Sequence, residues 1–74
     1  MGQKGRQIVE VDLQELLGQL RKAYLDELLA FYSYWVTALV AEGFHGEELA
    51  EHFQQEAREE LEHARKLAQR ILEL

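Results

Sequence analysis

The chain has 74 residues, 14 of them acidic and 8 basic, so its formal net charge is −6, and it contains no cysteine. This length suits a single domain, which we take to be residues 1–74, and a domain this small needs disulfides, a metal or association to hold a core. Without cysteine, what remains is a metal with oxygen and nitrogen ligands and association of copies. The acidic balance argues against a nucleic-acid partner. No signal peptide and no apolar run long enough for a bilayer is evident, so we expect no membrane partner and a cytoplasmic location.

The first predicted element is a helix over residues 12–42. Asp12 followed by Glu15 resembles a capping box at its start, and Gly43 suits its end. Apolar residues line two opposite sides of this helix, and a helix that is apolar all round is buried all round. We therefore expect a dimer mate on one side and further copies of the chain on the other, giving a higher homo-oligomer; the alternative is a loose dimer with an apolar back. The back of this helix comprises Leu25, Leu29, Tyr32, Val36 and Val40.

The second predicted element is a helix over residues 47–73. Glu47 and Glu48 favour its start, where the helix dipole is positive. It has one apolar stripe and one polar side, as an amphipathic helix does. The short linker forces the two helices into an antiparallel hairpin, so the predicted fold class is all-α. Two copies would form a four-helix bundle.

Three polar residues interrupt the apolar stripes at one level. Glu60 and His63 form a Glu-x-x-His element, whose spacing of three places both side chains on one helix face. Alone this element is a weak signal. Folding the hairpin about the linker between Phe44 and His45 puts residue 27 level with residue 62, so Glu27 should meet this pair. The spacing therefore predicts a site for a hard divalent metal such as iron or manganese.

A two-fold dimer would bring together two copies of Glu27, Glu60 and His63. One Glu from each of two helices and Glu-x-x-His from each of the other two is the ligand set of di-iron and di-manganese carboxylate bundles. Four carboxylates would balance two divalent cations, which means two irons per dimer. From position alone, we expect Glu60 to bridge the metals and Glu27 to bind one terminally. The alternative is a structural scaffold in which these groups are satisfied by water or arginine.

Three further residues near this level have candidate roles that the sequence pattern defines less sharply. Glu56 lies one turn before Glu60 and is a further candidate for the metal, as a ligand or a relay. The hairpin places Tyr34 opposite Glu56, so its hydroxyl could form a hydrogen bond with that carboxylate that only satisfies the core. In the functional alternative, Tyr34 donates one electron when oxygen is reduced. Glu59 would orient an imidazole across the dimer, or stay solvated.

The residues from Glu27 to Tyr34, and then Glu56 to His63, resemble the first helix pair of non-haem ferritin-like proteins. Bacterioferritins and the Dps-like ferritins of archaea and thermophilic bacteria are the most similar in pattern, and residues 5–9 look like the start of that Dps-like group. The resemblance implies a di-iron ferroxidase centre, with Glu27, Glu60 and His63 as ligands and Tyr34 as the tyrosine near the site.

Two departures from the family qualify this resemblance. Relatives carry four helices, and their third and fourth helices supply the second ligand set. Here a homodimer would supply it, as in encapsulated ferritins. Bacterioferritins bind haem through a methionine just after the bridging Glu, where this chain has Leu61, so no haem is expected. We therefore expect oxidation of Fe(II) by O₂ or peroxide, with a dimanganese site or a scaffold without redox activity as alternatives.

Overall fold

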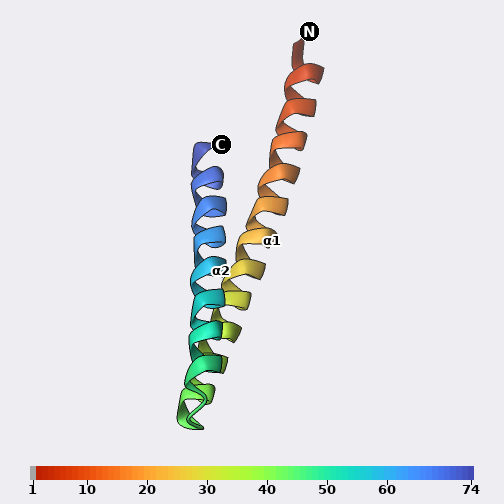
Figure 1. Cartoon of the computed structure of the whole chain (residues 1–74). Coiled ribbons are helices and arrows are strands. Elements are labelled where there is room, and N and C mark those ends of the chain that lie inside the picture. The colour runs from red at the N-terminus through yellow and green to blue at the C-terminus, as the bar shows by residue number, and fades with distance from the viewer. Residues whose placement is uncertain (1) are drawn as a thin grey trace.

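The computed structural model describes the backbone of residues 2–74 and the side chains of residues 10–74. It consists of two antiparallel helices, α1 (Gly2–Gly43) and α2 (Glu47–Glu73), joined by a three-residue turn (Figure 1). The hairpin is long and narrow, with principal extents of 65 × 14 × 11 Å. The predicted all-α hairpin is confirmed.

Helix α1 begins much earlier than the sequence predicts. It starts at Gly2 instead of residue 12, and Asp12 and Glu15 lie within it as exposed residues. The prediction of a capping box at Asp12 is therefore wrong. No proline occurs in the chain, so nothing breaks the helix ahead of Asp12. The extra turns carry α1 past the end of α2, where the two helices separate (Figure 1).

The turn between the helices is a Schellman motif. The Gly46 N–H donates to the Ala41 carbonyl at 2.8 Å, and the His45 N–H donates to the Glu42 carbonyl at 3.0 Å. His45 takes the left-handed conformation, with φ of 59°, that glycine usually provides in this motif. A Cβ on Gly46 would stand only 3.2 Å from the Ala41 carbonyl oxygen, so a side chain there would force a small shift of the turn. The turn then enters α2 directly, with the Gly46 carbonyl accepting from the Ala50 N–H at 2.8 Å.

The core between the helices is made of alanine. Among the residues whose side chains are described, the buried ones are Ala38, Ala41, Ala50, Ala57 and Ala64. The three on α2 recur every seven residues, which keeps them on one side of the helix. Such small side chains allow two helices to approach closely but bury little apolar surface. The larger apolar side chains of the two helices, where they are described, all stay at least partly exposed.

The helical register is the one that the sequence predicts. Glu27 of α1 lies beside Glu60 and His63 of α2, because the short turn leaves an antiparallel pair little freedom to slide. Within the described part of the chain, no helix combines the length and apolarity that crossing a bilayer demands.

Candidate metal centre

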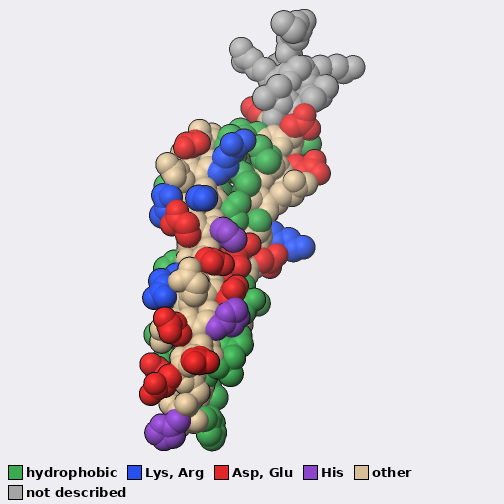
Figure 2. Space-filling view, in the orientation of Figure 1, with side chains coloured by type: hydrophobic (Ala, Val, Ile, Leu, Met, Phe, Trp, Pro, Cys, Tyr) green, Lys and Arg blue, Asp and Glu red, His purple; other side chains and the backbone are tan. Residues whose placement is uncertain are grey.

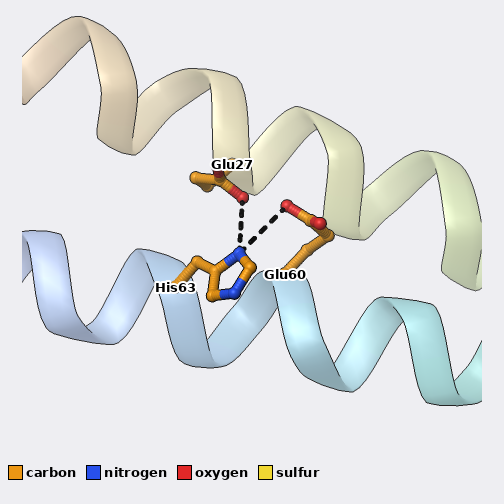
Figure 3. A group of neighbouring side chains, drawn as sticks. All are labelled: Glu27, Glu60 and His63. Atoms are coloured by element: carbon orange, nitrogen blue, oxygen red, sulfur yellow. Dashed lines mark ion pairs between the residues drawn. The ribbon is translucent and has the colours of Figure 1, made fainter.

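Glu27, Glu60 and His63 meet near the middle of α2. The His63 Nδ1 atom lies 3.5 Å from Glu27 Oε2 and 3.7 Å from Glu60 Oε2. Figure 3 shows the imidazole and the two carboxylates converging on one point between the helices. One ligand atom from each residue lies within 4.8 Å of the other two. The two helices thus supply a three-atom donor set at one level of the hairpin.

Burial differs among the three side chains. Glu60 is 20% exposed and Glu27 29% exposed, whereas His63 is 55% exposed. Glu27 Oε2 is buried and has no hydrogen-bond partner among the described residues. A buried carboxylate oxygen without a partner costs free energy, because it has lost its water and gained nothing in return. This orphaned acceptor is the observation that best fits a cation-binding role for the three residues.

The spacing of the three atoms fits a divalent metal better than a hydrogen-bonded triad. At 3.5 and 3.7 Å the nitrogen and oxygen atoms are too far apart for good hydrogen bonds. First-row divalent ions bond imidazole and carboxylate at about 2.0–2.2 Å, so two ligands of one ion stand roughly 3–4 Å apart. Two carboxylates and one imidazole also match the donor preference of iron and manganese. The residues present therefore fit such an ion.

A neighbouring carboxylate shows what a satisfied glutamate looks like on the same helix. Glu62 accepts hydrogen bonds from Arg65, the shortest at 2.7 Å, and both side chains face solvent. The hydrogen bond from Arg65 lowers the pKa of Glu62, so what this pair adds to stability is present near neutral pH and is lost as acid protonates the carboxylate. The positive charge of Arg65 is thus paired with Glu62, whereas the ion pairs that the described side chains give Glu27 and Glu60 are those with His63.

The other predicted site residues lie close by but outside the three-atom group. Tyr34 is half-buried and stacks on Phe53, with ring centroids 6.0 Å apart. The described side chains form no hydrogen bond between Tyr34 and Glu56, so that expected contact is absent. Glu56 is half-buried, and Glu59 is exposed and accepts a weak hydrogen bond from Gln55 at 3.4 Å. Any contact of Glu59 with an imidazole across a dimer stays a prediction.

Sequence reasoning missed no member of this donor set. Among the described side chains, no other three histidine, aspartate or glutamate residues come close enough to hold an ion. What the sequence did not reveal is the surrounding surface. All three histidines appear on one face of the hairpin, with acidic side chains between them (Figure 2). A face of this kind attracts cations toward the site.

The comparison with protein families decides the fold family. The family model of the ferritin-like domain matches residues 17–74, which include all of α2 and the three site residues. This chain belongs to the ferritin-like domain family. Ferritin-like domains typically bind iron, and here the carboxylate–histidine group sits in the part that matches. Searches of curated proteins and of solved structures found no match to this ferritin-like domain.

Proposed function

We propose that this ferritin-like domain binds Fe(II) through Glu27, Glu60 and His63 and oxidises it with O₂ or peroxide. The observation that carries the proposal is the buried Glu27 oxygen, which has no partner and lies opposite an imidazole nitrogen and a second carboxylate. A cation held among these three atoms would satisfy the orphaned oxygen and neutralise both carboxylates. Membership of an iron-binding family makes iron the first candidate.

The proposed centre is dinuclear and shared by two copies of the chain. One hairpin offers three protein ligands, and His63 remains 55% exposed on the open face of the pair. A two-fold mate on that face would add a second Glu27, Glu60 and His63, which completes the ligand set of dinuclear carboxylate bundles. Two divalent ions would then balance the four carboxylates. Without metal, the same four charges would repel, so binding and pairing favour each other.

In the proposed reaction Fe(II) is the substrate. Oxidation of two bound Fe(II) ions releases two electrons, which together with two protons reduce O₂ to hydrogen peroxide. Glu27 and Glu60 hold the ions and stabilise the higher charge of the oxidised product, and His63 fixes their position. Acidic Glu56 and Glu59 raise the local concentration of cations at the face. Tyr34, about two helical turns from Glu27 and stacked on Phe53, is the proposed donor of the second electron when only one Fe(II) is bound.

Manganese is the second candidate metal, because the same two carboxylates and imidazole suit it. A scaffold without redox activity is the competing class. The two classes differ in metal affinity, because a scaffold is not expected to bind a metal through Glu60.

Metal binding is tested by an anaerobic Fe(II) titration. We expect saturation at two irons per dimer, and we expect Glu60→Gln to weaken binding by at least tenfold, because it removes one ligand charge at nearly constant volume. The matched control is Glu51→Gln, an exposed glutamate of the same helix, which should bind like the native chain. Binding that does not saturate, or equal affinity in both variants, would refute the site.

Oxidation is tested by admitting air to the Fe(II)-loaded protein and following ferric absorbance in the near ultraviolet. We expect absorbance to grow faster than in buffer with the same iron. Tyr34→Phe should leave the iron stoichiometry unchanged and alter the peroxide released per iron, whereas Tyr32→Phe on the far side of α1 should change neither. Tight binding with no oxidation above buffer would reject the ferroxidase role and favour manganese.

A further inference from the structure

The side of α1 that faces away from the site is apolar and uncovered. Leu25 is 59% exposed, Leu29 65%, Tyr32 59% and Leu39 49%. With half-buried Val36, these residues follow one another at spacings of four, three, four and three, and we call them the α1 seam. At about 100° per residue the α1 seam lies roughly opposite Glu27 on the helix. A mate that covers the metal site therefore leaves the α1 seam exposed.

The spacing of the α1 seam is that of a helix packed on an equal helix. Apolar residues that repeat every 3.5 positions form the contact line of a coiled coil, in which side chains of one helix fill gaps in the other. Lys22 precedes the α1 seam at the next position of the repeat, and Gly43 follows it. The apolar contact line thus has defined ends and spans about two turns on either side of Tyr32.

The size and charge of this surface indicate its occupant. With flanking Trp35 (47% exposed) and Val40 (54%), the α1 seam presents on the order of 700 Å² of apolar surface, close to the roughly 800 Å² that each partner buries in a stable dimer. No charged residue occurs between Leu28 and Ala41, so a charged partner would find no counter-charge. A second identical seam matches it in length, spacing and lack of charge.

The alanine core gives an energetic reason for the α1 seam to be buried between copies. The hairpin buries five alanines and no larger described side chain, so its own packing is weak. We propose that the α1 seam is a second, two-fold interface between copies of this chain, with Tyr32 near the axis. This interface is distinct from the mate at the metal site and does not require it. Together the two contacts produce an assembly larger than a dimer.

The first test measures molar mass by light scattering on the Fe(II)-loaded protein under anaerobic conditions. We expect Leu29→Lys to halve the mass, to about 17 kDa if four chains become two of 8.7 kDa each. The control is Leu72→Lys, which places the same charge at a more exposed leucine (87%) of α2 and should leave the mass unchanged. Equal masses for Leu29→Lys and the native chain would overturn the proposal.

The second test does not depend on a destabilising charge. The chain has no cysteine, so Tyr32→Cys introduces its only thiol. Under mild oxidation we expect a disulfide-linked pair of chains, because the axis brings both copies of position 32 together, and Asp26→Cys on the polar side should give none. A Tyr32→Cys chain that stays unlinked would refute the interface. A chain that combines Glu27→Leu with Tyr32→Cys, binds no iron and still forms this link would separate failure of the α1 seam from failure of the metal site.

Discussion

Glu27 occupies an unusual position for a carboxylate. It lies in the middle of the inner stripe of α1, and its Oε2 atom is buried without a hydrogen bond. The imidazole of His63 at 3.5 Å is too distant to compensate well. A residue placed in this way lowers the stability of the bare protein, which fits the proposed role of Glu27 as a metal ligand.

The cost of this placement leads to a prediction for Glu27→Leu. The metal-free variant should be more stable than the native chain by about 1 kcal/mol, because an unpaired buried oxygen is replaced by an apolar group of similar volume. The same variant should lose the rise in melting temperature that Fe(II) gives the native chain. Thermal unfolding by circular dichroism, with and without anaerobic Fe(II), measures both effects. If the metal-free variant were less stable than the native chain, the Glu27 carboxylate would have a stabilising partner beyond the contacts of the single hairpin.

At the scale of the elements, the turn sets the register on which the site depends. His45 adopts a positive φ at the position of the Schellman motif where glycine is preferred. Histidine tolerates this conformation better than most residues but still pays a steric cost.

Replacing His45 should therefore change stability in a direction set by the new side chain. We expect His45→Gly to stabilise the hairpin by about 1 kcal/mol, since relief of the left-handed strain outweighs the added freedom of the unfolded chain. His45→Val should destabilise it, because a β-branched residue resists positive φ. Urea unfolding of both variants measures the difference, and iron binding should be retained in His45→Gly. Equal stability of the two would mean that the turn is not strained.

The elements also show what the sequence could and could not predict. The bounds of α2 and the meeting of Glu27 with Glu60 and His63 were predictable, because a short turn allows essentially one antiparallel register. The start of α1 was not, since Asp12 and Glu15 form a good capping pattern that the uninterrupted helix overrides. The contact between Tyr34 and Glu56 is missing because it depends on side-chain rotamers. The position of the two residues along the hairpin does not determine these rotamers. The stacking of Tyr34 on Phe53 has the same origin.

At the scale of the whole molecule, the hairpin is too thin to enclose a core. Its cross-section is 14 × 11 Å, about the width of two helices, and many of its large apolar side chains are half-exposed or more. We therefore expect folding and association to be linked, since the proposed contacts between copies would bury this apolar surface.

This linkage predicts that stability depends on protein concentration. The melting temperature of the native chain should rise as concentration is raised a hundredfold, because dilution favours separate chains. The rise should be smaller for Leu29→Lys, which weakens the α1 seam. Scanning calorimetry over that range of concentration tests both statements. A melting temperature independent of concentration would show that the single hairpin is stable by itself.

The alanine core has a consequence for how the site is adjusted. Ala57 and Ala64 lie on either side of Glu60 along α2, and their methyl groups act as spacers that determine how far α2 stands from α1. The gap between Glu27 and His63 is therefore determined in part by side chains that lie outside the donor set. We expect one added methylene at either alanine to widen the gap without altering a donor atom, so these positions would tune which ionic radius the proposed site accepts.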